Sequence, residues 1–482
     1  MARTTRNAKA ASAASAASAA SAERELRALL GPESVRPGDT REYLSDATES
    51  RAISGRADAI ALPETPAQVA AVLRWCYEHD VPLIPRGGGT GLAAGAVPVD
   101  GGVVLSMERM RTVRELRPEL WRTCVEAGLS TADLARRARE SGLYYPPDPG
   151  AAEQSQIGGN IATNAGGPHT FKYGVTGTWV TGLEVVIAPG KVITIGGPIR
   201  KDVAGYDLRS LLIGSEGTLG VITAAWLKLI PAPETQLPLV AFYPSVEAGG
   251  EALAATLGSG VIPAALEFLD AGALAAALAS FPGSAPPEPA FAVIAEADGS
   301  PAEAERVRAE IKEALSERAT VIHAPTERAG IDALWRWRSA VSTAVTSQRG
   351  GKVSEDIVVP VERLTEAIIA TQEIGARHDL PACSWGHAGD GNVHSTFLID
   401  RSHPSELERA EQAAGELFDL ARALGGSVSG EHGLGLVKAG ALEGQWSEPA
   451  LRLHESVKRL FDPKDLLNPG KKIARSRKPD AT

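Results

Sequence analysis

The first half of the chain alternates short apolar runs with amphipathic stretches. An apolar stripe at helical spacing follows Thr65, a residue suited to cap a helix, and Ser130 precedes a second such stripe. Because the alternation continues to Ile222, we expect strands and helices to follow one another through this half. The clearest strands are predicted at residues 81–85, 102–106 and 123–127.

The second half combines strands with longer amphipathic helices. The composition changes at residues 229–233, which predicts a domain boundary. Between residues 236 and 440 the pattern predicts an antiparallel sheet with helices on one side, an α+β arrangement. The Ala-rich residues 251–290 favour one helix followed by a mobile connection. Further helices are expected at residues 361–378, 404–424 and 448–461.

These boundaries divide the chain into folded domains and tails. At 482 residues the chain is long for one hydrophobic core. Its start repeats Ala-Ala-Ser without an apolar face, so we expect a disordered tail there. The predicted division is a tail at 1–22, a domain at 23–232, a second domain at 233–442, a segment at 443–475 that returns to the first domain, and a basic tail at 476–482.

Composition and charge exclude several classes of protein. The hydrophobic content of 44% is that of a globular protein, and the net charge of −10 argues against a nucleic-acid binder or an acidic-membrane binder. No apolar run is long enough for a transmembrane helix. Cys76, Cys124 and Cys383 lie far apart and are expected to be reduced, which favours a cytoplasmic protein and leaves peripheral membrane association open.

Two short segments near the C-terminus carry candidate chemistry. The first is Gly-His-Ala-Gly-Asp-Gly-Asn-Val-His at 386–394, and the second is Gly-Glu-His-Gly at 430–433. Two imidazoles and a carboxylate form a plausible divalent-metal set, and a further histidine suits general base catalysis. A two-residue turn at Asp390-Gly391 would place His387 directly opposite His394 on paired strands. The alternative is a Gly-rich loop with incidental surface histidines.

Three Gly-rich segments in the first half predict an anion site. They occupy residues 85–91, 157–167 and 214–223, and successive glycines let backbone N–H groups turn toward a phosphate. A P-loop is excluded because Gly-Lys-Ser/Thr is absent, and a Rossmann turn is disfavoured because no helix follows residues 87–95 directly. The remaining interpretation is a flavin diphosphate loop of another fold.

In combination, these segments resemble those of the FAD flavoproteins of the vanillyl-alcohol-oxidase (PCMH) type. The motifs are PRGGGTGL, IGGNIATNAGG, GYDLRSLLIGSEGTLGVIT, GHAGDGNVH, GEHG and LNPGK. Within that type the chain is similar to the group of D-2-hydroxyacid dehydrogenases, glycolate oxidase D subunits and D-lactate dehydrogenases, over residues 40–475. The resemblance implies an α+β protein with a two-subdomain FAD-binding domain and a substrate (cap) domain. It also implies non-covalent FAD, since no histidine lies at residues 86–95.

The resemblance also implies roles for individual residues. The FAD diphosphate would lie on Arg86, Gly87, Gly88, Gly89, Thr90 and Gly91. The flavin would be lined by Pro147, Asp148, Ser155, Gly158, Gly159, Asn160, Asn164 and Gly174. The adenosine side would contact Glu216, Gly220 and Ile222, and Asn468 would close over the cofactor. A divalent metal, Zn or Mn, would be held by His387, His394 and Glu431. The catalytic base would be His432, and the substrate carboxylate would bind Arg338 and Lys352.

The implied reaction is oxidation of a small D-2-hydroxy acid, of lactate or glycolate type, to the 2-oxo acid. Thr396 and the spacing from Arg338 to Lys352 depart from the 2-hydroxyglutarate enzymes. As the anchor for the substrate carboxylate, Arg338 is preferred to Arg336, and only the alternation of residues in Trp-Arg-Trp-Arg supports that choice. Rival interpretations are an alcohol or sugar oxidase of the same fold and a flavin-bearing subunit of a larger redox complex. The electron acceptor could be a quinone, a cytochrome, an electron-transfer protein or oxygen, and a homodimer is left open.

Overall fold

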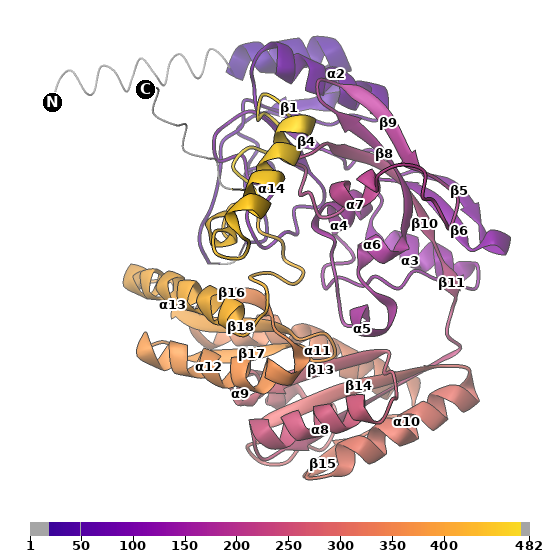
Figure 1. Ribbon diagram of the computed structural model, residues 1–482, viewed down its shortest axis with the longest axis vertical. Coiled ribbons are helices and arrows are strands. Elements are labelled where there is room, and N and C mark those ends of the chain that lie inside the picture. The colour runs from indigo at the N-terminus through magenta and orange to yellow at the C-terminus, as the bar shows by residue number, and fades with distance from the viewer. Residues whose placement is uncertain (1–18, 49, 474–482) are drawn as a thin grey trace.

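The computed structural model describes residues 19–48 and 50–473 and shows two domains, between which the chain crosses near residue 232 and again in the segment before α14 (Glu448–Phe461), as Figure 1 shows. The first domain begins with a small mixed sheet in the order β1-β2-β4-β3. Helix α2 (Pro66–Glu78) starts where the sequence predicts, and the Thr65 hydroxyl accepts a hydrogen bond from the N–H of Gln68 at 3.2 Å. The strands of this sheet are β1 (Val35–Pro37), β2 (Ala59–Ala61), β3 (Leu83–Arg86) and β4 (Val103–Ser106).

A five-stranded antiparallel sheet forms the other half of this domain, in the order β5-β6-β10-β8-β9. One continuous hydrophobic core joins it to the small sheet and to α2. Its strands are β5 (Val113–Arg117), β6 (Arg122–Glu126), β8 (Val180–Ile187), β9 (Lys191–Gly196) and β10 (Val221–Lys228). Its helices are α3 (Thr131–Glu140), α4 (Ile157–Thr163), α5 (Thr170–Tyr173), α6 (Thr176–Trp179) and α7 (Leu208–Leu212), and β7 (Leu143–Tyr144) pairs with β11 (Ile230–Pro231) beside them.

The second domain is a seven-stranded antiparallel sheet in the order β15-β12-β14-β13-β17-β18-β16. The strands are β12 (Thr235–Tyr243), β13 (Ala265–Asp270), β14 (Phe291–Gly299), β15 (Val321–His323), β16 (Gly350–Val358), β17 (Ala382–His387) and β18 (Asn392–Asp400). The helices are α8 (Val246–Gly258), α9 (Ala271–Ala277), α10 (Pro301–Ser316), α11 (Arg328–Arg349), α12 (Leu364–Arg377) and α13 (Pro404–Ala423). The predicted α+β layers and antiparallel sheet are therefore confirmed.

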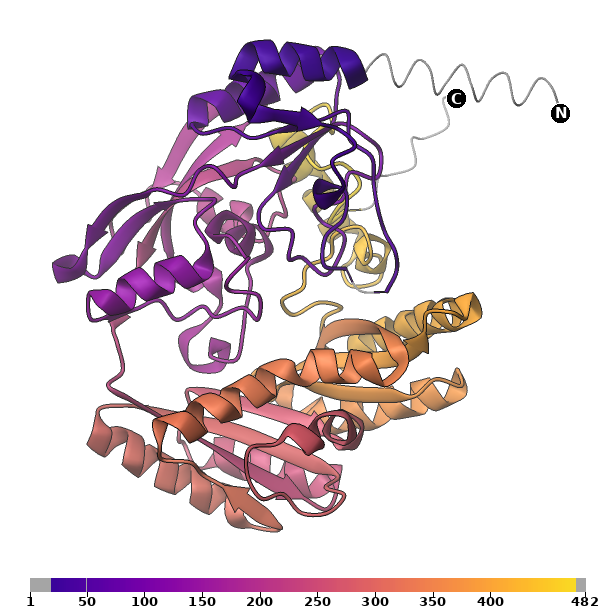
Figure 2. The same ribbon diagram turned by 180° about the vertical axis from the view of Figure 1, so that it is seen from behind.

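Helices cover both faces of this sheet, so the prediction of helices on one side is wrong. On β12, Leu239 packs in the core shared with α8, α10, α12 and α13, whereas Val240 packs in the core shared with α9 and α11. Figure 2 shows α11, in orange, lying across the face opposite α12 and α13. The continuous apolar run 237–243 is the sequence signal of a strand buried on both faces.

The Ala-rich residues 251–290 also differ from the prediction. Instead of one helix and a mobile connection, they contain the end of α8, the central strand β13 and then α9. Alanine favours helix, but β13 pairs with a neighbour on each side, β14 and β17, and its six residues are all buried. Tertiary burial therefore overrides local propensity here, and this strand carries a residue of the site described below.

The C-terminal segment returns to the first domain. Helix α14 (Glu448–Phe461) matches the predicted helix, and Leu467 then bridges Leu83 beside the small sheet. Lys471, in the segment predicted to return to the first domain, is buried and donates to the carbonyl of Val97 at 3.0 Å. At the other end, a helix already includes residues 19–22, and the rest of the predicted N-terminal tail lies outside the described residues. Among the described residues, no helix has the length and apolarity to span a bilayer.

Candidate active site

A single cavity of about 830 Å³ lies between the two domains, a size suited to a cofactor or a drug-sized ligand. From the first domain it is lined by most of the predicted cofactor residues, namely Arg86, Gly87, Gly88, Gly89, Thr90, Gly91, Asp148, Ser155, Gly158, Gly159, Asn160, Glu216, Gly220 and Ile222. From the second domain and the loop after it come Arg338, Lys352, His387, His394, Glu431 and His432. The fold thus brings the two predicted groups of residues to one continuous space.

The glycines of the first domain serve two purposes. A Cβ on Gly88 would lie 2.0 Å from the carbonyl oxygen of Gln154, so this glycine lets the first Gly-rich loop contact the residues before the second. A Cβ on Gly91 or Gly159, in contrast, would meet no atom closer than 3.8 Å. Packing therefore does not require glycine at these two positions, and both line the cavity. Their missing side chains leave room there for a large planar or phosphate-bearing ligand.

Four predicted cofactor residues do not line the cavity but support the loops behind it. The Asn164 side chain accepts a hydrogen bond from the N–H of Gly177 at 2.8 Å, and Asn164 ends α4. Gly174 ends α5 with a positive φ of 79°, and Pro147 is buried. The Asn468 amide donates to the carbonyls of Gly95 and Glu216, both at 2.8 Å, and so ties the C-terminal segment to the first domain.

Arg86 and Glu216, two charged residues predicted to contact the cofactor, form hydrogen bonds with other parts of the protein. The Arg86 guanidinium donates to the carbonyls of Ser45 and Glu42 at 2.7 and 2.9 Å, so its charge holds the connection between β1 and β2. The Glu216 carboxylate accepts from the N–H groups of Leu434 and Gly435 at 3.0 and 2.7 Å. Glu216 therefore fastens the loop that follows the Gly-Glu-His-Gly segment to the first domain.

The His387, His394 and Glu431 side chains converge on one point. His387 Nε2 lies 3.2 Å and His394 Nε2 lies 3.6 Å from the same carboxylate oxygen, Glu431 Oε1. The predicted hairpin register is wrong, because His387 pairs with Asn392 and Trp385 pairs with His394. The turn spans residues 388–391 rather than two residues, which makes the two histidines diagonal neighbours on one face. Their rings still lie 5.3 Å apart between centroids.

The chemistry of this cluster fits a divalent ion of borderline hardness. Two imidazole nitrogens and a carboxylate oxygen face one another within 4.8 Å. Burial, together with His432 and His387, lowers the pKa of His394 well below its ordinary value, so His394 is neutral and able to ligate. Its Nδ1 is buried and has no hydrogen-bond partner among the described residues. Burial of His387 opposes its protonation, but Glu267 and Glu431 raise its pKa well above the ordinary value. A proton therefore bridges His387 and Glu431 where a metal is absent.

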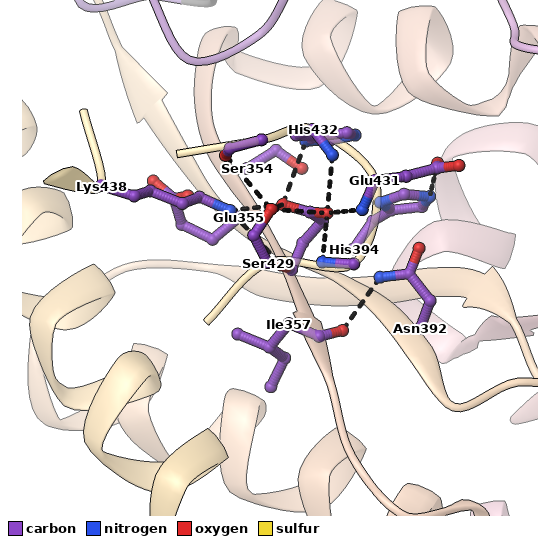
Figure 3. Close-up of polar contacts among 12 residues, drawn as sticks. Ser354, Glu355, Ile357, Asn392, His394, Ser429, Glu431, His432 and Lys438 are labelled. Carbon is purple, nitrogen blue, oxygen red and sulfur yellow. Dashed lines mark hydrogen bonds and ion pairs between the residues drawn. The ribbon is translucent and has the colours of Figure 1, made fainter. Parts of the chain in front are cut away.

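The loop that carries Glu431 and His432 is held by Asp356. Figure 3 shows Glu431, His432, Ser429 and Lys438 gathered at this point. One oxygen, Asp356 Oδ2, accepts from the backbone N–H groups of Gly430, Glu431 and His432 at 2.8, 2.6 and 2.9 Å. Asp356 also pairs with the buried ammonium of Lys438. Burial opposes ionisation, but His432, Lys438 and these N–H groups hold the pKa of Asp356 well below its ordinary range. Asp356, which sequence reasoning missed, is therefore a permanent anion beneath the loop.

His432 stands at the edge of the cavity beside His394. The two rings are stacked, with centroids 5.1 Å apart and an interplanar angle of 11°. His432 Nδ1 lies 3.6 Å from Asp356 Oδ1. This arrangement places the carboxylate near Nδ1, so that Nε2 is the nitrogen left to exchange a proton with a ligand.

The two predicted carboxylate anchors are both buried and both occupied by protein partners. Arg338 donates hydrogen bonds from Nε and from one terminal nitrogen to Glu267 Oε2, at 3.0 and 2.5 Å. Lys352 donates to the carbonyl and hydroxyl of Ser342 at 3.0 and 2.5 Å and lies 5.1 Å from the Trp385 ring centroid. Arg336 is exposed, and Arg338 lines the cavity. The only sequence signal for Glu267 is a carboxylate inside the apolar run Leu-Glu-Phe-Leu.

His169, another residue that the sequence reading missed, links the domains at the cavity wall. Its Nδ1 lies 2.6 Å from Asp148 Oδ2 in its own domain, and its Nε2 lies 3.0 Å from Glu296 Oε1 in the second. Glu296 Oε2 accepts from the indole of Trp335 at 2.7 Å. Since ionised carboxylates only accept hydrogen bonds, His169 must donate from both nitrogens and is an imidazolium. Burial opposes that charge, but Asp148 and Glu296 raise the pKa of His169 well above its ordinary value.

Comparison with known protein families decides the class of the protein. The family described as "FAD linked oxidases, C-terminal domain" matches residues 232–472, and the "FAD binding domain" family matches residues 57–196. The glycolate oxidase subunit GlcD of Bacillus subtilis is 37% identical over 94% of this chain and 96% of its own length. The chain belongs to the FAD-linked oxidase family. The predicted resemblance and the FAD class of cofactor are thereby confirmed.

Other relatives in this family carry related names. The D-lactate dehydrogenase of Anaerostipes hadrus is 34% identical over 92% of this chain and 95% of its own length. The D-2-hydroxyglutarate dehydrogenase of Stutzerimonas stutzeri is 34% identical over 86% of this chain and 91% of its own. The structure of p-cresol methylhydroxylase with substrate bound superposes with a TM-score of 0.79 at 18% identity, covering 95% of this chain and 97% of that one. This last likeness confirms the predicted PCMH-type fold.

Proposed function

We propose that this FAD-linked oxidase converts a small D-2-hydroxy acid, of lactate or glycolate type, to the corresponding 2-oxo acid. One observation carries the proposal. A single cavity connects the Gly-rich loops of the FAD-binding domain to the cluster of His387, His394 and Glu431 and to two buried cations, Arg338 and Lys352. A 2-hydroxy acid offers a hydroxyl for the cluster and a carboxylate for a cation, so it uses both features at once.

The names of the relatives support this substrate class. Glycolate, D-lactate and D-2-hydroxyglutarate each carry a hydroxyl on the carbon next to a carboxylate, and enzymes named for each are 34–37% identical to this chain. A neutral alcohol or sugar has no carboxylate, so the rival oxidase interpretation gives the two cations that line the cavity, Arg338 and Lys352, no group of the substrate to bind.

The cluster would hold a divalent metal, Zn or Mn, through His387, His394 and Glu431. Such an ion, when bound, would polarise the substrate hydroxyl and lower its pKa. The protein's own part is to present the imidazoles of His387 and His394 and the carboxylate of Glu431 at one point. Their positions are fixed by strands β17 and β18 and by the Asp356-anchored loop.

His432 would act as the general base. It lies beside the cluster, and its Nδ1 side faces the permanent anion Asp356, which would stabilise the imidazolium once a proton has been taken. FAD, when bound without a covalent link, would supply the acceptor for the hydride from the substrate carbon. Arg338 and Lys352 would orient that carbon by binding the carboxylate.

A substrate panel tests the proposal. Purified holoenzyme is mixed with an artificial dye acceptor and with D- and L-lactate, glycolate, D- and L-malate, D-2-hydroxyglutarate and a neutral alcohol of matched size. We expect dye reduction with D-lactate or glycolate and none with the L-acids or the alcohol. Turnover of the alcohol with no turnover of any hydroxy acid would refute the proposal.

A second function is favoured by the name of one relative, a glycolate oxidase "subunit". In that case the chain would oxidise its substrate but would need a partner to pass electrons to a quinone, a cytochrome or another acceptor. The two functions differ in the dye assay. A flavin that bleaches with substrate in a single turnover, with no steady-state dye reduction, indicates the subunit role.

A further inference from the structure

Glu267 is a fully buried carboxylate that contacts two parts of the proposed site at once. It lies on the central strand β13, directly paired with His387 on β17. Its Oε1 lies 2.6 Å from His387 Nδ1, and its Oε2 accepts from Nε and a terminal nitrogen of Arg338 at 3.0 and 2.5 Å. Each carboxylate oxygen therefore serves a different partner.

We infer that Glu267 is a positioning residue that sets the metal-ligating face of His387 and the pose of Arg338 together. The inference rests on the proposed function, because it assigns Glu267 a role toward the proposed metal and substrate carboxylate. Glu267 itself is not among the residues that line the cavity, whereas His387 and Arg338 are.

The first half of the argument concerns His387. A carboxylate that accepts at Nδ1 fixes the proton on that nitrogen, so the lone pair of a neutral ring is left on Nε2. His387 Nε2 is the nitrogen that lies 3.2 Å from Glu431 Oε1, at the centre of the cluster. Glu267 thus selects the tautomer that can ligate and holds the ring plane toward Glu431.

The second half concerns Arg338. Its Nε edge is fully used by Glu267, so a bidentate grip on the substrate carboxylate through that edge is not available. The other terminal nitrogen, Nη1, is left for the substrate. A guanidinium clamped along one edge has few rotamers, so Nη1 is held in one direction relative to His387.

A glutamine in place of Glu267 cannot perform both tasks. Its carbonyl oxygen could accept from His387 or from Arg338, but its NH₂ group would then face a donor on the other side. If the NH₂ faces His387, Nδ1 must become an acceptor, and the ring proton moves to the nitrogen that should bind metal. If the NH₂ group faces Arg338, the guanidinium loses the acceptor that holds it in one direction.

The same strand provides a matched control. Asp270 is also a fully buried carboxylate on β13, but it accepts from the N–H groups of Ala273 and Ser384 at 2.9 and 2.8 Å and contacts neither His387 nor Arg338 in the described structure. Asp270→Asn therefore removes a carboxylate charge that is as fully buried as that of Glu267 but has no contact with His387 or Arg338 in the described structure.

The test compares wild-type holoenzyme with Glu267→Gln, Glu267→Asp and Asp270→Asn. Each protein is stripped of metal and titrated with Mn²⁺ and with Zn²⁺ by calorimetry, and KM, kcat and bound FAD are measured. Loss of a partner that orients a metal-bound histidine typically weakens metal binding about 10–100-fold. In Glu267→Gln we expect metal binding to weaken by this factor and KM to rise, while the FAD content stays unchanged. Asp270→Asn should keep the wild-type metal Kd and KM although its melting temperature falls.

Glu267→Asp keeps the charge but is one methylene shorter, so it should retain at most one of the two contacts and show a defect in metal Kd or in KM. If Glu267→Asp or Glu267→Gln keeps both the wild-type metal Kd and the wild-type KM, the inference is overturned and the proposed function stands. If wild-type enzyme oxidises a hydroxy acid but binds neither ion, the metal part of the proposed function falls, and the inference falls with it.

Discussion

Asp356 fixes His432 through the main chain as well as the side chain. Its Oδ2 accepts from the backbone N–H of His432 at 2.9 Å, and its Oδ1 lies 3.6 Å from the ring nitrogen Nδ1. The same Oδ2 also holds the N–H of Glu431 at 2.6 Å. One buried anion thus places both the proposed base and a proposed metal ligand, which lie on a loop that crosses between the domains.

Asp356→Asn should damage both stability and activity. The substitution removes one of the two carboxylates, Asp356 and Glu355, that pair with the buried ammonium of Lys438, and breaking a buried ion pair typically costs about 3–5 kcal/mol. Because the folded pKa of Asp356 lies below its unfolded value, its contribution to stability is present above the unfolded pKa, about 4, and is lost as pH falls through the folded value. Urea unfolding at pH 7 should show the loss, and the difference between wild type and variant should shrink in acid. An unchanged unfolding midpoint would contradict this account.

His432→Ala should slow reduction of the flavin by substrate while leaving FAD bound. Loss of a general base typically costs about 10²–10⁴-fold. Stopped-flow bleaching of the flavin gives the rate, and the absorption spectrum gives the FAD content. His454→Ala is the control, since His454 is an exposed histidine on α14. A reduction rate within a few-fold of wild type would rule out His432 as the base.

Removal of the metal should abolish turnover without releasing FAD. The proposed ligands belong to the second domain and the loop after it, whereas the Gly-rich loops belong to the first. Dialysis against a chelator, with metal content measured before and after, should therefore give a yellow, inactive protein that regains activity with Zn²⁺ or Mn²⁺. Full activity in protein shown to be metal-free would refute a metal-assisted reaction.

Arg338→Ala and Lys352→Ala should each lower kcat/KM for the hydroxy acid. A lost charge-assisted contact costs about 1.5–3 kcal/mol, or roughly ten- to a hundred-fold. Arg336→Ala is the matched control, because Arg336 lies two residues away on α11 and is exposed. Arg338→Ala should also lower the melting temperature, since it removes the guanidinium that pairs with the buried carboxylate of Glu267. A defect in Arg336→Ala with none in Arg338→Ala would show that the other arginine anchors the substrate.

His169→Gln should weaken the link between the domains in a pH-dependent way. The folded pKa of His169 lies above its unfolded value, so its contribution is fully present below about pH 6.5 and is lost as pH rises through the folded pKa. Melting temperature measured across pH should therefore differ most between wild type and variant at neutral and lower pH, and the two curves should approach each other in alkali. Curves that stay parallel over the whole range would exclude a titrating role for His169.

The sequence by itself determined the local features of this protein. Thr65 and Ser130 cap helices as predicted, because a cap needs only residues within one turn of it. The Gly-rich loops and the His-bearing segments are likewise contiguous in the chain, so their residue types already indicated a cofactor loop and a possible ligand set. The family follows from those same segments.

Only the tertiary structure decided which charges neutralise one another. Glu267 lies 120 residues from His387, and Asp356 lies 76 residues from His432, so no local pattern links them. Glu267 was also hidden in an Ala-rich stretch, whose helical propensity gave way to burial between two neighbouring strands. A buried carboxylate is stable only beside its partners, and those partners are brought to it by long-range packing of strands rather than by anything within a few residues of it.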